Sequence, residues 1–469
     1  MASSLDANQQ AADQVLLGQL NYKLPSTASY ILDRRAVSFF TNSAGTYSPT
    51  GVRTFRIQLN SDHAWADLNT LSLSFTIKNT AGANTRLMNK CHGPWSLIQR
   101  MRVSVSGTVV EDLQYYGRLH EQFYQLSSSD MQRTEATRGF LARGRYGARF
   151  TRAKIAGGQT YTVAMKPLSG LLQCGRFFPI AWCPIVIECE LAPADVSWVS
   201  GPTLTPGDGL TYTQQYELSD ARINVDLCTL DSSMHEEFSK LMENGGSLPL
   251  TITSFAHFNQ AILGANPVVS LTRACSRIRD VLWSFTRRRI AGNIPITEVA
   301  IDPDLPDPLP PNTQIDQVVS WVNDFFYPKR SDVDVNDATD ACLYEAQWWL
   351  GAKSLGPEQT FRYTHEYLQE LYKALGYLND TKALPDLDRY HYLTECHMGG
   401  VTLERALNVA MTGLSSRSGS LLSVQFRRLA PAAIPDGALA GELSADQVWI
   451  VIMHEVAVSL TKAGVVVAD

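Results

Sequence analysis

Histidine and cysteine side chains that lie close together in the sequence are the first candidates for chemistry in this chain. His391, Cys396 and His397 stand near enough to one another to suggest a metal cluster. Their spacing matches no zinc pattern, so we expect no metal centre there. His454 falls on the apolar phase of a strand, which favours a histidine packed in a core over a metal ligand.

A short acidic run resembles the start of a calcium-binding loop. Asp332, Asp334 and Asn336 occupy the first, third and fifth positions of such a loop. The sixth position is Asp337 where the loop requires glycine, and the twelfth is Leu343 where it requires glutamate. We therefore interpret the run as a solvated acidic turn.

Sequence motifs for nucleotide binding and hydrolysis are missing. The chain contains no GxxxxGK[ST], HExxH, GxSxG or GxGxxG motif. The adjacent pair Trp348 and Trp349 points to opposite faces of a strand, which favours a core position and a contact surface over a sugar-binding platform. We accordingly assign no catalytic, cofactor-binding or metal-binding residue, expect no cofactor, and expect the protein not to be an enzyme.

Charge also narrows the range of partners. The 469 residues carry a formal net charge of −6, which argues against a protein that coats nucleic acid. The N-terminal segment 1–19 has two acids and no lysine or arginine. Segment 127–160 is rich in arginine and could touch phosphate groups, but exposure to solvent or salt bridges between subunits is the more ordinary role.

The cysteines favour a reducing compartment. The eight cysteines form no CxxC pair and show no regular spacing, so we expect them to be mostly reduced and buried. No basic segment followed by an apolar run marks a signal peptide at the N-terminus. The most apolar stretch, 448–460, is too short to span a bilayer and contains a histidine and a glutamate. We expect assembly inside a cell rather than secretion.

Alternation of apolar and polar residues dominates the chain and predicts strands with one buried face. The clearest strands are predicted around residues 55–59, 71–77, 101–105, 161–165, 185–191, 223–227, 281–285, 422–426 and 448–452. Strands without long helices between them favour an antiparallel sandwich or barrel.

Helical spacing interrupts the strands in three places. Apolar residues recur three and four apart in 113–126 and 362–375, and a third helix is predicted over 232–243, ended by Gly245 and Gly246. In both halves two strands precede a hairpin, near Gly107 and Gly351, and a helix and further strands follow. This repeated order predicts two similar sandwiches in tandem.

Several segments then resemble the double jelly-roll major capsid proteins of double-stranded DNA viruses. They are Gly51 to Thr80, Met165 to Ala192, Tyr216 to Ser233, the helix YTHEYLQELYKALG, and the closing strands from VWIVIMHEVAVSL onward, in the family's order. The resemblance covers about residues 30–469 and is strongest to the capsid proteins of polinton-like viruses, adintoviruses and virophages. Nucleocytoplasmic large DNA viruses and the adenovirus hexon are more distant.

The resemblance implies a mainly β fold of two tandem antiparallel eight-stranded jelly-roll sandwiches, with short helices in the connecting loops. It divides the chain into an N-terminal arm (1–29), a first jelly roll (30–231), a linker helix (232–247) and a second jelly roll (248–469). It implies a homotrimer that forms pseudo-hexagonal capsomers in an icosahedral virion. The partners would be neighbouring capsomers, penton and minor capsid proteins, with an internal membrane or the genome as further contacts and no small-molecule substrate.

Two other functions stay open from the sequence. The first is a minor capsid or vertex protein of the same virus class. The second is a carbohydrate-binding or carbohydrate-active β-sandwich, which would need paired carboxylates in a cleft or an exposed row of aromatic residues.

Three segments are predicted to act outside the sandwiches. A short helix over 11–20 would expose Val15, Leu16 and Leu20 and fold only on docking to a partner. The long loops 127–160 and 290–340 would protrude. Within the second loop, the proline- and aspartate-rich 302–312 is expected on the virion exterior.

Overall fold

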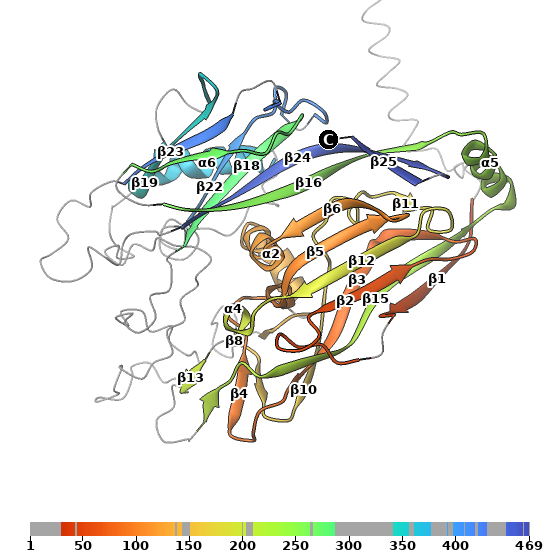
Figure 1. Ribbon diagram of the computed structural model, residues 1–469, viewed down its shortest axis with the longest axis horizontal. Coiled ribbons are helices and arrows are strands. Elements are labelled where there is room, and N and C mark those ends of the chain that lie inside the picture. The colour runs from red at the N-terminus through yellow and green to blue at the C-terminus, as the bar shows by residue number, and fades with distance from the viewer. Residues whose placement is uncertain are drawn as a thin grey trace, which may run out of the picture.

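The computed structural model contains two β-sandwiches built from consecutive halves of the chain (Figure 1). It describes residues 30–42, 45–136, 138–142, 151–198, 200–202, 210–262, 266–286, 341–355, 361–376, 392, 397–407, 409–417, 421–428, 447–462 and 464–468.

Two sheets form the first sandwich. One contains, in spatial order, β1 (Ile31–Phe40), β15 (Tyr216–Leu230), β3 (Trp65–Asn79) and β10 (Thr160–Met165), and the short β11 (Phe177–Phe178) also pairs with β3. The other contains β2 (Thr54–Leu59), β12 (Ile185–Leu191), β5 (Ile98–Val105) and β6 (Thr108–Gln114). All these pairs are antiparallel.

The second sandwich repeats this arrangement. Its first sheet contains β16 (Leu248–Ala261), β24 (Gln447–Thr461), β18 (Ile278–Thr286) and β22 (Met398–Thr402), and β25 (Gly464–Ala468) also pairs with β24. Its other sheet contains β17 (Val268–Leu271), β23 (Leu422–Arg428), β19 (Ala341–Leu350) and β20 (Lys353–Leu355), with β21 (Phe361–Tyr363) also pairing with β19.

The strand order is the same in both halves. When the eight principal strands of each half are numbered along the chain, one sheet runs first, eighth, third, sixth and the other runs second, seventh, fourth, fifth. This is the arrangement of a jelly roll, in which strands from the two ends of the segment lie side by side. The expected fold of two tandem antiparallel jelly rolls is confirmed.

Turns and helices follow local sequence rules. The β5–β6 hairpin turns at Ser106 and Gly107, whose φ angles of 49° and 85° suit a two-residue turn with left-handed residues. Helix α5 (Ser232–Glu243) starts at Asp231, whose carboxylate accepts the Ser233 N–H at 3.2 Å, and Gly245 follows its end at φ 78°. The predicted helix 232–243 is therefore confirmed.

The other helices lie in loops. Helix α2 (Tyr116–Gln125) and helix α6 (Thr364–Ala374) occupy equivalent places, between the fifth and sixth principal strands of their sandwiches. The predicted helix 113–126 begins later than expected, because Leu113 belongs to β6. The remaining helical turns are η1 (Pro94–Leu97), α3 (Ser129–Ala136) and α4 (Ala194–Ser197).

Connecting loops of the first sandwich form a smaller sheet at its end (Figure 1). Its strands are β13 (Gly201–Pro202), β14 (Thr211–Tyr212), β4 (Thr85–Met88) and β9 (Lys154–Ala156), of which β14 and β4 run parallel. The segment 127–160, expected to be a long irregular loop, in fact contributes α3, the pair β7 (Leu141–Ala142) and β8 (Thr151–Arg152), and β9. That expectation of an irregular loop was wrong for these residues.

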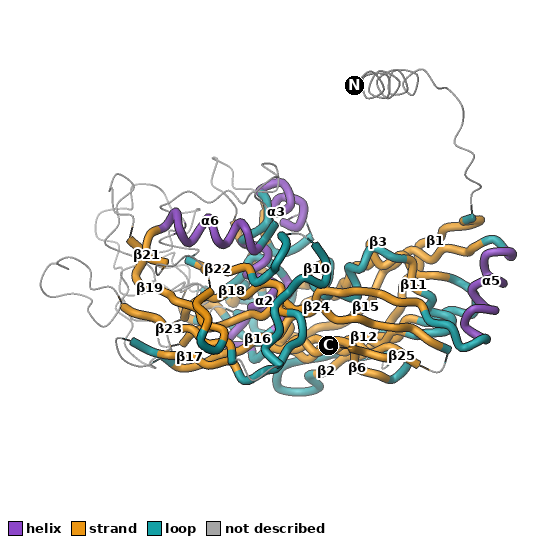
Figure 2. The backbone as a smooth tube through the Cα atoms, turned by 90° about the horizontal axis from the view of Figure 1, so that it is seen from above, coloured by secondary structure: helices purple, strands orange, loops and turns teal. Residues whose placement is uncertain are grey.

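The two sandwiches share one hydrophobic core cluster. Figure 2 shows the long strands β16 and β24 of the second sandwich running alongside elements of the first, with α5 at the far end. The structure describes two sets of sheets. The division of the chain at 1–29, 30–231, 232–247 and 248–469 stays a prediction.

Candidate assembly surface

Residues considered for chemistry from the sequence are buried or outside the described part of the chain. His454 is buried, 1% exposed, on β24. His397 is also buried against Phe285 and Tyr367, and burial lowers its pKa to about 4. His391 and Cys396 lie outside the residues whose placement is described, so the expectation that these three residues form no metal centre stays a prediction.

Other candidates divide in the same way. Trp348 is fully buried and Trp349 is half-buried, in agreement with opposite faces of β19. The acidic run Asp332, Asp334 and Asn336, the arm 1–29 and the segment 302–312 lie outside the described residues. Among the described residues, no group of three histidine, cysteine or acidic side chains is arranged to hold a metal ion.

Cysteine burial agrees with the expectation. Of the six cysteines with described side chains, five are buried and Cys174 is half-buried, and no disulfide joins them. No helix in the described part of the chain is long and apolar enough to cross a membrane.

The most elaborate polar site is instead the seam between the two sandwiches. Glu111 on β6 is 2% exposed and accepts hydrogen bonds from the Ser169 hydroxyl and from the N–H groups of Gly170 (3.1 Å) and Leu171 (3.0 Å). Burial raises the pKa of Glu111, while these bonds and one from Ser254 on β16 oppose the rise. One carboxylate thus fixes the 168–173 turn of the first sandwich and reaches the second.

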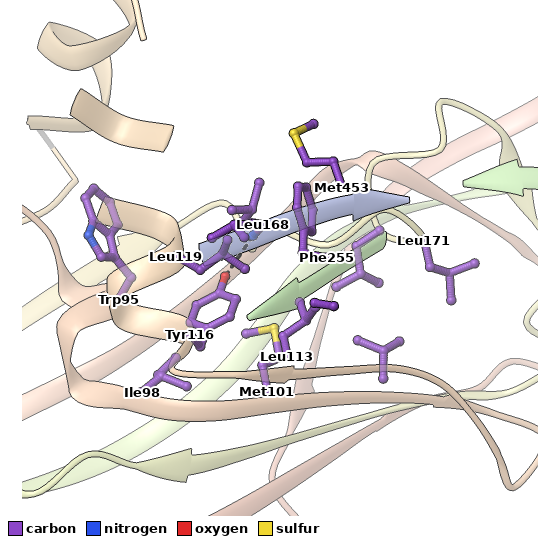
Figure 3. Packing of buried hydrophobic residues seen from close by; sticks show 14 of the residues in the cluster. Trp95, Ile98, Met101, Leu113, Tyr116, Leu119, Leu168, Leu171, Phe255 and Met453 are labelled. Atoms are coloured by element: carbon purple, nitrogen blue, oxygen red, sulfur yellow. Dashed lines mark hydrogen bonds between the residues drawn. The ribbon is translucent and has the colours of Figure 1, made fainter. Parts of the chain in front are cut away.

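Close packing joins this turn to β16. A Cβ atom on Gly170 would lie 2.1 Å from the carbonyl oxygen of Thr253, so only glycine lets the two backbones approach this closely. Figure 3 shows the surrounding apolar side chains, with Phe255 and Met453 of the second sandwich facing Leu168 and Leu171 of the first.

Helix α2 supplies the rest of the seam. Gln122 and Arg118 both donate to the hydroxyl of Ser284 on β18, at 2.6 and 3.2 Å. The Arg118 guanidinium also lies 4.5 Å above the ring of Trp449 on β24. Phe123 packs edge to face on Phe255, at 5.2 Å between ring centres. Because polar and aromatic contacts alternate across it, the seam fixes the relative position of the sandwiches as well as burying apolar surface.

A second buried carboxylate holds the base of α2. Glu121 is 1% exposed and accepts from the Trp95 indole at 2.7 Å, from Gln125 at 3.2 Å and from the His92 ring. Burial alone would raise the pKa of Glu121, but the charge and hydrogen bond of His92 and the other donors lower it to about 2. Glu121 is therefore a structural anion that joins α2 to η1.

The second sandwich contains an acidic cluster at the start of β18. Asp280 is 1% exposed, and Arg279 lies beside it (Nε to Oδ2, 3.2 Å) and beside Glu404 (Nε to Oε1, 2.8 Å). Burial raises the pKa of Asp280 to about 7; Arg279 and Thr402 oppose this, and Glu404 and Glu455 add to it. The cluster fastens the segment after β22 to β18.

Exposed parts of the surface differ in whether charged residues protect them against contact with another chain. Strand β1 is a sheet edge, paired only with β15 among the described strands. Asp33 and Arg35 lie on the face of β1 that turns towards the core, at the end of the strand where that face is still exposed to solvent. Charged residues on this face protect a sheet edge against pairing with another chain. By contrast, the segment after β22 exposes Leu407, Val409 and Met411 without such protection.

None of these tertiary features was predicted from the sequence. Glu111, Ser169 and Ser254 are far apart in the chain and belong to no motif. The signal that could have found them is an acidic residue among apolar strand positions, because such a residue needs buried donors. The buried glutamate in β6 fits that description.

Comparison with known proteins identifies the fold. No family model matches the sequence, and no curated protein matches it. Among solved structures, VP54 of the virus PBCV-1, fitted into a reconstruction of the virophage Sputnik, is similar with a TM-score of 0.62 at 10% identity, covering 96% of this chain and 99% of that one. The PBCV-1 virus capsid gives a TM-score of 0.59 at 10% identity, over 96% of this chain and 99% of that one.

The Faustovirus major capsid protein is similar as well, with a TM-score of 0.51 at 8% identity over 97% of this chain and 98% of that one. These likenesses extend through both sandwiches. They show that the chain has the double jelly-roll fold of these capsid proteins.

Proposed function

We propose that this chain is the major capsid protein of an icosahedral double-stranded DNA virus, and that it forms homotrimeric, pseudo-hexagonal capsomers located in the virion. The observation that carries the proposal is the jelly-roll strand order, which occurs twice in one chain. A structural likeness over 96% of the chain to the PBCV-1 virus capsid supports it.

The seam supports a mechanical role. A shell subunit must keep its shape while many copies press on one another, and two sandwiches joined by a loose linker would not. Here the buried hydrogen bond that Glu111 accepts from Ser254, and those that Ser284 accepts from Arg118 and Gln122, join the sandwiches over and above their apolar contact. The chain behaves as one rigid block in this proposal.

The proposal includes no catalytic role. The buried carboxylates Glu111 and Glu121 act as hydrogen-bond partners within the fold. The division into arm, first jelly roll, linker helix and second jelly roll belongs to the proposal too, as do neighbouring capsomers, penton and minor capsid proteins as partners.

Light scattering of the purified chain at micromolar concentration tests the proposal. We expect a mass three times that of the chain, because obligate interfaces commonly bury ~2,000–5,000 Å² and hold at this concentration. Electron micrographs of the same sample should show particles of near-hexagonal outline. A stable monomer would contradict the proposal, and a copy number of a few per particle would indicate a minor capsid protein instead.

A further inference from the structure

Two adjacent loops of the second sandwich form a surface that is both apolar and basic. We call it the basic apolar patch, and it consists of Arg273, Arg277, Arg405, Leu407, Val409, Met411 and Arg417. Its three apolar side chains are 47%, 52% and 37% exposed. An exposed apolar group of this kind on a soluble protein marks a contact site.

The two loops are joined to each other and to β18. Ile278 and Leu414 exchange backbone hydrogen bonds of 2.7 and 3.0 Å. The Ser416 N–H donates to the Cys275 carbonyl oxygen at 2.9 Å, and the Cys275 N–H donates to the Ser416 hydroxyl at 3.0 Å. A Cβ atom on Gly413 would lie 2.5 Å from the carbonyl oxygen of Ile278, so the loops touch through their backbones.

The apolar segment is held in a fixed shape. Met411 has a φ of 66°, a conformation that residues other than glycine rarely adopt. Its N–H donates at 2.6 Å to Glu455, a carboxylate only 4% exposed. The Thr412 hydroxyl donates to the carbonyl oxygens of Ala406 and Val409 at 3.0 and 2.9 Å. A segment held in one conformation suits a partner whose surface also keeps one conformation.

Charge indicates which partner fits. Among the described residues 271–280 and 403–417, both acids are buried, Asp280 at 1% exposed and Glu404 with a side chain 5% exposed. Beyond these loops, the part-exposed Asp112 of β6 lies near Arg273. The four arginines outnumber it, so the patch is basic on a chain with a net charge of −6. A surface with an excess of acid that also exposes an apolar group is available on the chain itself: α5 exposes Glu236, Glu237 and Glu243 beside Leu241. Lys240 and Lys462 pair with Glu236 and Glu243 respectively, so the three acids there exceed the lysines by one. Opposite charges on the two sides of an interface favour correct association.

We propose that the basic apolar patch binds an acidic surface on a second copy of this chain and forms part of the contact between subunits of the capsomer. The inference rests on the proposed function and names where the copies meet. The patch and the acidic surface are different surfaces, so the contact is heterologous and closes into a ring of copies.

The test uses the full chain and three variants. The patch variant carries Leu407→Ser, Val409→Ser and Met411→Ser, and a charge variant carries Arg405→Glu and Arg417→Glu. The control variant carries Leu32→Ser, Val52→Ser and Val466→Ser, which alter side chains 65%, 61% and 60% exposed at other places on the surface. Circular dichroism checks that every variant keeps its strands.

Association is measured by sedimentation over a hundredfold range of concentration. We expect the wild type and the control to associate alike, and both other variants to need at least tenfold higher concentration for half association. Added salt should weaken the association of the wild-type chain and have less effect on the association of the charge variant. A photo-crosslinker placed at Val409 should join two chains.

Two results would overturn the inference while leaving the capsid proposal intact. One is wild-type association of the patch variant. The other is binding to vesicles of phosphatidylcholine and phosphatidylserine, or to duplex DNA, that the patch variant loses while its association is unchanged. A wild type that stays monomeric throughout would overturn both proposals.

Discussion

Replacing Gly170 with alanine should loosen the joint between the two sandwiches. Gly170 lies in the turn that Glu111 holds, and its N–H donates to that carboxylate at 3.1 Å. The added Cβ would lie 2.1 Å from the carbonyl oxygen of Thr253 and 2.8 Å from its carbonyl carbon. Thr253 pairs with Glu455 in the β16–β24 ladder, so neither backbone can move without disturbing other hydrogen bonds.

The size of the effect follows from this geometry. Ordinary contact begins at 3.4 Å, so the turn and β16 must separate by about 1.3 Å, the difference between 3.4 and 2.1 Å. Adding a methyl group to a well-packed interior costs ~1–3 kcal/mol. The added Cβ conflicts with two backbone atoms of Thr253, which cannot rotate away as a side chain can, and the movement would also stretch the hydrogen bonds to Glu111. We therefore expect a loss of stability at the upper end of this range, about 3 kcal/mol.

Urea unfolding followed by tryptophan fluorescence measures this loss at one fixed protein concentration, since association alters apparent stability. The matched control is Gly82→Ala, because a Cβ at Gly82 meets nothing within 4 Å. The control should unfold like the wild type. If the free energy of unfolding of Gly170→Ala lies within about 0.5 kcal/mol of that of Gly82→Ala, the close packing of the seam does not stabilise the chain.

Three further substitutions test the buried groups. Asp280→Asn should flatten the pH dependence of stability: burial raises the pKa of Asp280 from 3.8 to about 7, so the folded chain retains a proton that the unfolded chain releases. Wild-type stability should therefore fall by up to ~4 kcal/mol between pH 4 and 7, and the variant's should not. Glu121→Gln should change the pH dependence of stability in the opposite direction, because the pKa of Glu121 is lowered from 4.5 to about 2. The substitution should lower the free energy of unfolding by ~3 kcal/mol at pH 7, and this difference from the wild type should shrink as pH falls from 4.5 towards 2. Gly399→Ala places a Cβ 2.1 Å from the Trp283 ring and should cost about 3 kcal/mol, with a changed tryptophan emission; equal stability in that variant would contradict the packing described.

Several elements were predictable because local rules govern them. Helix α5 begins and ends where its N-terminal aspartate and C-terminal glycines place it, and most long strands follow simple alternation. The limits of α2 were not predictable from spacing alone. Leu113 continues the helical spacing of apolar residues, but Tyr115 adopts a φ of 52° and separates strand from helix.

Strands that depend on tertiary contact were missed. Strand β22 reads as a loop because it contains Gly399 and Gly400, which have low strand propensity. The structure explains both glycines: a Cβ on the first would meet Trp283, and a Cβ on the second would meet Leu371 of α6 at 2.8 Å. Strand β1 was missed because most of its residues are exposed on both faces, so alternation is weak.

The seam and the patch could not be predicted, because each joins segments distant in sequence. Glu111 meets its donors only after the jelly roll brings β6, the 168–173 turn and β16 together. The patch likewise depends on two loops that the strand order places side by side. Sequence spacing carries information about neighbours along one element and little about which elements meet.

The repeated architecture and the seam have a joint consequence for assembly. If three chains form a ring, six sandwiches of one strand order surround the axis, and a nearly hexagonal outline requires the two sandwiches of each chain to keep a fixed relation. Apolar contact alone would permit sliding, because it has no preferred direction. The hydrogen bond from Ser254 to Glu111, those from Arg118 and Gln122 to Ser284, and the close approach of Gly170 to Thr253 all depend on direction. They limit the joint to one arrangement, and contacts such as the basic apolar patch then determine which sandwich of one copy meets which of the next.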